Sequence, residues 1–121
     1  MPVSSRVPIP NALMLISDLG GGTAPDLMRD SLIASTSTCI AVGCMADGNG
    51  ETEITLGAAQ DVGLSQGPAF EGELETPSHA IGVWTVLRKT ILQVAVPRSS
   101  TKVRIWVNHS SEPDKVVIGL D

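Results

Sequence analysis

Aromatic residues are nearly absent from this sequence. It contains one phenylalanine, two tryptophans and no tyrosine among 121 residues. Proteins that bind single-stranded nucleic acid without sequence preference need several aromatic side chains on which bases stack, so the composition argues against that activity. With so few aromatic side chains, the hydrophobic core must be built from Val, Ile, Leu, Ala and Met.

Clusters of basic residues are missing as well. The net charge is −5 at pH 7, and the eight Lys and Arg residues do not gather in one segment. Because phosphate backbones repel acidic surfaces, we expect no nucleic-acid partner. A protein with a basic surface would be attracted instead.

Long hydrophobic runs do not occur either. No stretch of 18 apolar residues is present, so we expect no membrane-spanning helix. Prolines at positions 2, 8 and 10 interrupt the N-terminal segment, and its apolar stretch, residues 12–16, is too short for the core of a secretory signal. We therefore expect a cytoplasmic protein.

The two cysteines are too few for a disulfide framework. Cys39 and Cys44 lie five positions apart, which on one extended strand separates them by more than ~15 Å and places them on opposite faces. They cannot form a disulfide without a break between them, although a bulge at Gly43 would provide one. We expect two buried free thiols, which suits a reducing compartment.

Alternation of apolar and polar residues is the main pattern that the sequence does contain. Hydrophobic residues make up 42% of the chain and charged residues 17%, so we expect one folded domain spanning residues 1–121. In KVRIWVNH, for example, Val103, Ile105 and Val107 fall on one face of a strand. The predicted strands lie at 12–18, 31–37, 38–46, 50–57, 69–76, 80–87, 90–96, 102–108 and 115–120, and 31–46 can also be read as one long bent strand.

Segments rich in Gly, Pro, Asn, Asp and Ser separate these strands. The only plausible helix is APDLMRDSL, one or two turns that start near Pro25. Many short strands joined by turns are typical of a β-sandwich or a barrel. The prediction is an all-β sandwich of about eight mostly antiparallel strands with at most one short helix.

Residues 46–53, ADGNGETE, resemble the start of a calcium loop. Asp47, Asn49 and Glu51 fit the first three ligand positions of an EF-hand, but Thr52 replaces the required Gly and Ala58 replaces the required Glu. Asp-Gly and Asn-Gly are strong signals for the turn of a hairpin. We therefore expect a hairpin between CIAVGCM and ETEITLG.

Three carboxylates at alternate positions, Glu71, Glu73 and Glu75, form what we call the acidic series. On a strand they share one face, with neighbours ~7 Å apart. The series could bind a basic partner or, weakly, a divalent cation. Alternatively, it is a solvated sheet face or pairs with cations on neighbouring strands; the candidates are Arg88, Lys89, Lys102 and Arg104.

Trp106 lies on the face of its predicted strand that opposes Val103 and Ile105, beside Arg104. Trp and Arg are the residues that most often anchor protein interfaces, and Trp84 has a similar position on its own strand. Trp106 could instead point inward. The candidate partner-binding residues are therefore Glu71, Glu73, Glu75, Arg104 and Trp106.

Motifs for metal binding or catalysis are not found. His79 and His109 are the only histidines, and there is no HxH, HExxH or CxxC spacing. There is no G-x-S-x-G motif, and no Lys follows the glycines at 20–22 as a phosphate-binding loop would require. We expect no metal, no cofactor and no enzymatic activity.

The C-terminal run from Ala80 to Asp121 resembles the competence protein J family. The shared pattern is a strand ending in Arg88-Lys89, a strand ending in Pro97, a strand with a central Trp106, an acidic loop and a last aliphatic strand over residues 116–120. The resemblance covers roughly residues 77–121. It implies the fold of these small bacterial β-sandwich proteins, which inhibit a nuclease, and an inhibitor or immunity-type role.

Three functions follow from these observations. The first is a non-enzymatic protein-binding module, an inhibitor or immunity-type protein for a basic partner such as a nuclease. The second is a structural homo-oligomeric subunit, such as a phage-like or shell component. The third is a small-ligand-binding protein or an enzyme.

Overall fold

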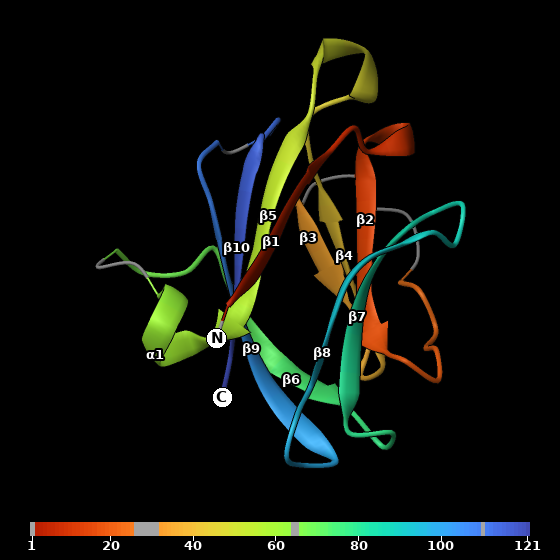
Figure 1. Cartoon of the computed structure of the whole chain (residues 1–121), viewed down its shortest axis with the longest axis vertical. Coiled ribbons are helices and arrows are strands. Elements are labelled where there is room, and N and C mark those ends of the chain that lie inside the picture. The colour runs from red at the N-terminus through yellow and green to blue at the C-terminus, as the bar shows by residue number, and fades with distance from the viewer. Residues whose placement is uncertain (1, 26–31, 64–65, 110) are drawn as a thin grey trace.

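Two five-stranded β-sheets pack face to face in the computed structural model of this chain (Figure 1). The structure describes residues 2–25, 32–63, 66–109 and 111–121. Sheet A has the strand order β1-β5-β10-β9-β6, and sheet B has the order β3-β4-β2-β7-β8. The strands are β1 (Val3–Val7), β2 (Leu13–Asp18), β3 (Ile33–Ser35), β4 (Cys39–Gly43), β5 (Thr52–Ala58), β6 (Phe70–Glu75), β7 (Ala80–Thr85), β8 (Thr90–Ala95), β9 (Ser100–Val107) and β10 (Lys115–Leu120).

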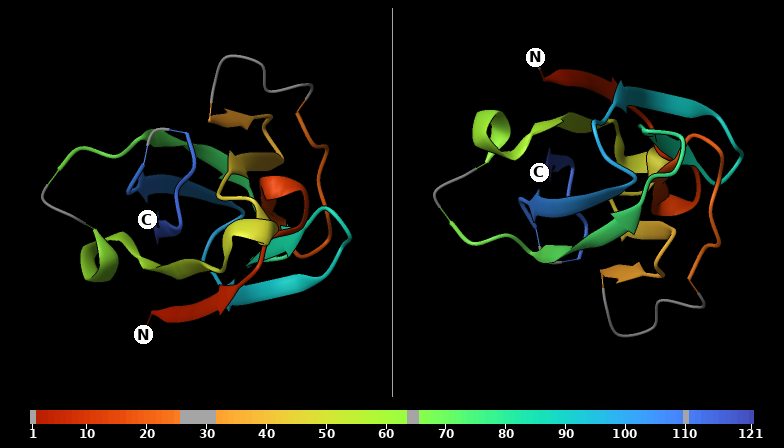
Figure 2. Two further views of the ribbon diagram at one scale, coloured as in Figure 1. Left: turned by 90° about the horizontal axis from the view of Figure 1, so that it is seen from above. Right: turned by 90° about the horizontal axis from the view of Figure 1, so that it is seen from below.

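The predicted fold class is confirmed. Seen along the strands, the two sheets form separate layers (Figure 2). Neighbouring strands are antiparallel except β5 and β10, which run parallel. In the described part of the chain, no helix is long and apolar enough to cross a membrane.

The core lies between the sheets and is aliphatic, as the composition predicts. Val103 and Ile105 of β9 are fully buried, whereas Arg104 between them is only partly buried. The largest fully buried side chains come from both sheets and, at Ile9, from the segment between β1 and β2. They include no aromatic residue; they are Ile9, Met14, Ile16, Ile40, Val42, Ile54, Leu56, Leu74, Ile81, Val83, Ile105 and Ile118.

The predicted hairpin at residues 46–53 is wrong. Strand β4 pairs with β2 and β3 in sheet B, whereas β5 pairs with β1 and β10 in sheet A. The turn Asp47–Asn49, a single 3-10 turn, therefore carries the chain from one sheet to the other. A turn signal shows only that the chain reverses. Two strands that each have one apolar face can bury those faces either as neighbours in one sheet or by packing against each other across the sandwich.

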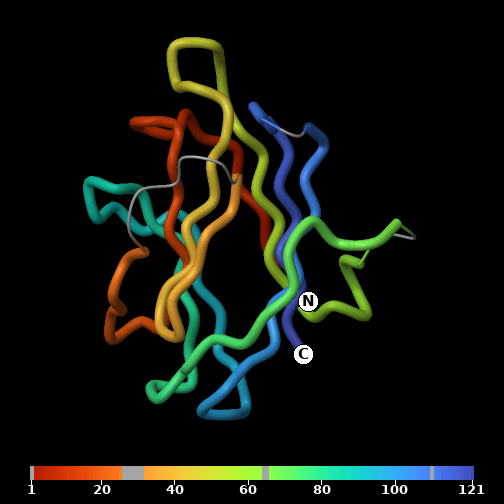
Figure 3. The backbone as a smooth tube through the Cα atoms, turned by 180° about the vertical axis from the view of Figure 1, so that it is seen from behind, coloured from red at the N-terminus to blue at the C-terminus, as the bar shows by residue number. Residues whose placement is uncertain are grey.

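The segment 31–46 contains two strands rather than one. Strands β3 and β4 pair antiparallel, with Ile33 opposite Val42. Thr36 closes the turn between them, because its hydroxyl accepts hydrogen bonds from the N–H groups of Thr38 and Cys39. Figure 3 shows both strands from behind the view of Figure 1.

The N-terminal strand β1 was not predicted. Pro2 and Pro8 flank it, and its half-buried residues alternate with exposed ones. β1 pairs only with β5 among the described strands and forms an edge of sheet A. Edge positions tolerate neighbouring prolines, since proline removes a hydrogen-bond donor that such a strand does not need on both sides.

A helix that the sequence did not predict lies at residues 59–62. The four-residue helix α1 (Ala59–Val62) follows β5 directly and packs against sheet A (Figure 1). The helix predicted from Pro25 onward falls mostly on residues 26–31, which lie outside the described residues.

Candidate partner-binding surface

Strand β6 forms an edge of sheet A and carries the acidic series. Glu71, Glu73 and Glu75 are exposed, whereas Leu74 between the last two is fully buried. The alternation predicted from the sequence is therefore correct. Charged side chains on an edge strand disfavour pairing with other strands, so this edge suits contact through side chains rather than extension of the sheet.

Glu71 is paired with cations of the neighbouring strand. Its carboxylate oxygens lie 3.2 Å from Nε of Arg104 and 3.5 Å from Nζ of Lys102. Arg104 also lies 3.3 Å from Oδ2 of Asp121. The Nε atom of Arg104 makes no hydrogen bond, so its contact with Glu71 is electrostatic. Cross-strand pairing, one of the two interpretations of the acidic series, describes Glu71.

Glu73 and Glu75 differ from Glu71. In the register with β9, Glu73 lies opposite Lys102 and Glu75 lies opposite Ser100. Among the residues that the structure describes, neither carboxylate forms an ion pair. Neighbouring cations therefore balance the charges of Glu73 and Glu75 less than the charge of Glu71.

Trp106 is buried rather than exposed. It lies on the outer face of sheet A, as the alternation predicts, but its side chain is only 4% exposed. Its indole N–H donates a hydrogen bond of 2.9 Å to the carbonyl of Gln66, and the ring lies close to Gly63 and Gly119. The sequence left open whether Trp106 is an exposed anchor or points inward. It is a packing residue on the outer face, because Gly63 and the carbonyl of Gln66, from the segment after β5, cover its ring.

A second group of charges crosses three strands of sheet A. Glu53 lies 2.9 Å from Arg6 and 3.9 Å from Lys115. The hydrogen bond from Arg6 lowers the pKa of Glu53 below its ordinary value and raises the pKa of Arg6. The negative charge of Glu53 on the outer face of sheet A is therefore balanced by the neighbouring cations Arg6 and Lys115.

Asp18 is the one buried carboxylate among the described residues and lies at the end of β2. Oδ1 accepts a hydrogen bond from the N–H of Ser78 at 2.8 Å, and Oδ2 accepts one from the N–H of Gly20 at 2.7 Å. Burial acts to raise the pKa of Asp18, but hydrogen bonding with the Ser78 side chain and with the N–H groups of Gly20 and Ser78 outweighs it and holds the pKa below the ordinary value of 3.8. Asp18 thus remains charged and ties the loop after β2 to the turn before β7.

The histidines and cysteines form no metal site in the described ranges, where no three His, Cys, Asp or Glu side chains cluster. Nδ1 of His109 accepts hydrogen bonds from the backbone N–H groups of Ser111 and Glu112, so it closes a loop. Cys39 and Cys44 are free and buried, as predicted. Burial raises the pKa of Cys44 to about 12, so its thiol is unreactive at neutral pH. The cytoplasmic location stays a prediction.

Gly22, the last of the glycines at 20–22, packs against the turn before β4. A Cβ atom at Gly22 would collide with the carbonyl oxygen of Thr38. Thr23 next to it donates its N–H to the Thr38 hydroxyl at 2.9 Å. Glycine is needed at position 22 for the close approach of two backbones.

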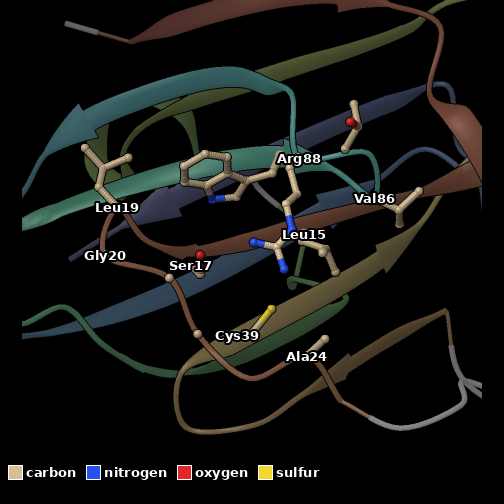
Figure 4. Close-up of a pocket in the computed structure, with 12 residues that line it drawn as sticks. Leu15, Ser17, Leu19, Gly20, Ala24, Cys39, Val86 and Arg88 are labelled. Atoms are coloured by element: carbon tan, nitrogen blue, oxygen red, sulfur yellow. The ribbon is translucent and has the colours of Figure 1, made fainter.

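Sequence reasoning missed a cavity on the outer face of sheet B (Figure 4). Its floor includes Leu15 and Ser17 of β2, and Arg88 contributes to its wall. A signal was present in the stretch LMLISD, where Leu13 and Leu15 are apolar on the face opposite Met14 and Ile16. Apolar residues on both faces of a strand indicate that something covers the outer face too.

No family model matches the sequence, and no curated protein matches it. Two solved structures are similar along nearly the whole chain. The crystal structure of ComJ, inhibitor of the DNA degrading activity of NucA, from Bacillus subtilis, has a TM-score of 0.64 at 13% identity, over 98% of this chain and 93% of ComJ. A structure described as Crocagin biosynthetic gene J has a TM-score of 0.56 at 13% identity, over 99% of this chain and 96% of its own.

These similarities confirm the resemblance at the level of the fold. They extend it from the C-terminal third of the sequence to the whole β-sandwich. At 13% identity the comparison carries the architecture alone.

Proposed function

We propose that this protein is a non-enzymatic protein-binding module, an inhibitor or immunity-type protein for a basic partner such as a nuclease. The observation that carries the proposal is the similarity to the fold of ComJ over 98% of the chain. The net charge of −5 supports the same role, because a protein that degrades nucleic acid must present a cationic surface to phosphate groups.

The acidic edge of sheet A is the part of the surface that suits such a partner. Glu73 and Glu75 are exposed and unpaired within the described chain, so their field extends into solvent. Opposite charges on two proteins accelerate their encounter and orient them. An inhibitor that occupies the cationic surface of a nuclease excludes DNA from it.

Trp106 and Arg104 take supporting roles in this proposal. Trp106 holds the segment around Gln66 on the outer face of sheet A, and Arg104 connects Glu71 with Asp121. Both residues therefore shape the surface next to Glu73 without being its most exposed members.

The test is an assay of DNA degradation. The immobilised protein captures partners from an extract of its source cells at low ionic strength, and each captured nuclease is purified and titrated with the free protein. The proposal expects inhibition that saturates at a fixed molar ratio and weakens at high salt. It is overturned when excess protein leaves the rate of DNA degradation unchanged for every basic nuclease captured.

A structural homo-oligomer is the second candidate, and Leu87 favours it. Leu87 is 71% exposed, and it is the one large hydrophobic side chain exposed among the described residues. It borders a groove of about 340 Å³ whose lining includes Val7, Pro8, Pro10 and Ile91. Light scattering at low and high salt separates the candidates: a multimer stable at both, and dispersed by Leu87→Gln, supports the structural role.

A further inference from the structure

The cavity on the outer face of sheet B is built from three strands and two loops. Its volume is about 490 Å³, within the range of small-molecule sites. The floor consists of Leu15 and Ser17 from β2 and Cys39 from β4. The loop after β2 and the hairpin between β7 and β8 form the walls, to which Leu19, Gly20, Gly21, Gly22, Ala24, Trp84, Thr85, Val86 and Arg88 contribute.

One wall of the cavity is an aromatic surface. Trp84 lies opposite Leu15 in the pairing of β7 with β2, and its side chain is only partly buried. A Cβ atom at Gly82 would lie 3.0 Å from the indole ring and 2.9 Å from Leu19. Because Gly82 has no side chain, the indole of Trp84 can lie flat against the sheet at this position. A flat apolar molecule could stack on this ring.

Two hydrogen-bond donors of this cavity have no acceptor in the described part of the chain. The indole nitrogen of Trp84 is buried and makes no hydrogen bond, which is uncommon for a buried N–H group. Arg88 is exposed and forms no ion pair with any described residue. Figure 4 shows its side chain extending over the floor toward Ser17 and Leu15.

The described lining of the cavity carries a positive charge in a protein of net charge −5. Among the lining residues that the structure describes, Arg88 is the one charged side chain. The nearest acidic neighbour in sequence is Asp18, whose two oxygens accept hydrogen bonds from Gly20 and Ser78. The site therefore complements an anion.

The backbone holds Arg88 in an unfavourable conformation. Its φ angle is 65°, a region that favours glycine. The Thr85 hydroxyl accepts hydrogen bonds from the N–H groups of Leu87 and Lys89, which fixes the hairpin. An arginine at a position where glycine would be less strained is consistent with a use for its side chain.

We infer that this cavity binds a small aromatic carboxylate. The aromatic part stacks on Trp84 and covers the apolar floor, and the carboxylate accepts hydrogen bonds from the exposed guanidinium of Arg88. A cation would be repelled by Arg88, and a wholly apolar molecule would leave the guanidinium of Arg88 without an anionic partner. The inference does not depend on the proposed inhibitor role.

Calorimetric titration with 2-naphthoate and its uncharged analogue 2-naphthamide tests the inference. We expect 2-naphthoate to bind about tenfold more tightly than the amide, since a charge-assisted hydrogen bond contributes roughly that factor. Arg88→Gln should remove this preference. Lys89→Gln is the matched control, because it removes one charge from the same hairpin outside the cavity lining and should leave the preference intact.

Arg88→Gly guards against a trivial loss of folding. Glycine relieves the strain at this position, so this variant should fold as well as the wild type and still lose the preference for the carboxylate. In a ¹⁵N-correlated spectrum, 2-naphthoate should shift the indole signal of Trp84 and leave that of Trp106, which is bonded to Gln66, in place.

Three results would overturn the inference. They are equal affinities for the acid and the amide in the wild-type protein, equal effects of Arg88→Gln and Lys89→Gln, and the absence of any shift of the Trp84 signal at millimolar 2-naphthoate.

Discussion

Asp18 is a single residue that joins segments distant in the sequence. Its carboxylate accepts N–H donors from Gly20, two positions on, and from Ser78, sixty positions on. Because the group is buried, removing it leaves two backbone donors without an acceptor. The same loop forms a wall of the cavity on sheet B, so Asp18 also supports that site.

We expect Asp18→Ala to lower the free energy of unfolding by about 1–3 kcal/mol at neutral pH, the usual cost of unsatisfied buried donors. The pKa of Asp18 is lower in the folded protein than its ordinary value of 3.8. The stability that its charge contributes is therefore present above that pH and lost as the pH falls through the folded pKa.

Denaturant titrations between neutral and acidic pH measure this difference. The gap between wild type and Asp18→Ala should narrow below pH 3.8. The exposed Asp47 provides the control, since Asp47→Ala should change stability little at any pH. A gap that is constant with pH would show that the Asp18 charge contributes no stability.

At the scale of elements, β6 and β9 show how pairing divides the acidic series. The antiparallel register places Glu71 opposite Arg104 and Glu73 opposite Lys102, but both cations lie nearest to Glu71. Exposed ion pairs of this kind add little stability. Their consequence is a gradient of charge along β6, from compensated at Glu71 to uncompensated at Glu75.

This gradient predicts unequal effects of neutralising substitutions on partner binding. Glu73→Gln together with Glu75→Gln should slow association with a basic partner by roughly threefold to tenfold at low ionic strength, because electrostatic steering acts on the association rate. Glu71→Gln should have a smaller effect, since its charge is already balanced. Stopped-flow association rates at low and high salt measure both.

Dissociation rates and circular dichroism serve as controls for a general loss of structure. If the variant that combines Glu71→Gln, Glu73→Gln and Glu75→Gln associates at the wild-type rate, the acidic series plays no part in binding. An effect of Glu71→Gln equal to that of the double variant would contradict the gradient.

At the scale of the whole molecule, the inner faces of both sheets form one hydrophobic cluster. Ile16 and Val83 of sheet B and Val103 and Ile118 of sheet A belong to it. Neither sheet can separate from the other without exposing this apolar surface to water. The two tryptophans report on different sheets, Trp84 on sheet B and Trp106 on sheet A.

We therefore expect both sheets to unfold in one transition. In Trp84→Phe the fluorescence of Trp106 reports on sheet A, and in Trp106→Phe the fluorescence of Trp84 reports on sheet B. Within each variant the denaturation midpoint by fluorescence should equal the midpoint by circular dichroism. Separate midpoints in either variant would show that the sheets are independent units and would contradict a single domain over residues 1–121.

The sequence by itself determined the class of fold and the inward face of most strands. Alternation in KVRIWVNH places Val103 and Ile105 in the core, because successive side chains of a strand point to opposite sides. It also determined the aliphatic core and the exposed acidic series. The shortest elements were less visible: β1 has a weak pattern between two prolines, and α1 has only four residues, too few for a periodicity to be recognised.

Only the tertiary structure decided which strands pair and what covers their outer faces. The partners of β5 come from the two ends of the chain, and turn residues near Asp47 carry no information about such distant segments. The burial of Trp106 depends on a carbonyl forty positions away, and the cavity beside Trp84 depends on Arg88 reaching back over β2. Local patterns reflect the geometry of one strand, whereas pairing, covering and cavities arise from contacts between segments far apart in the sequence.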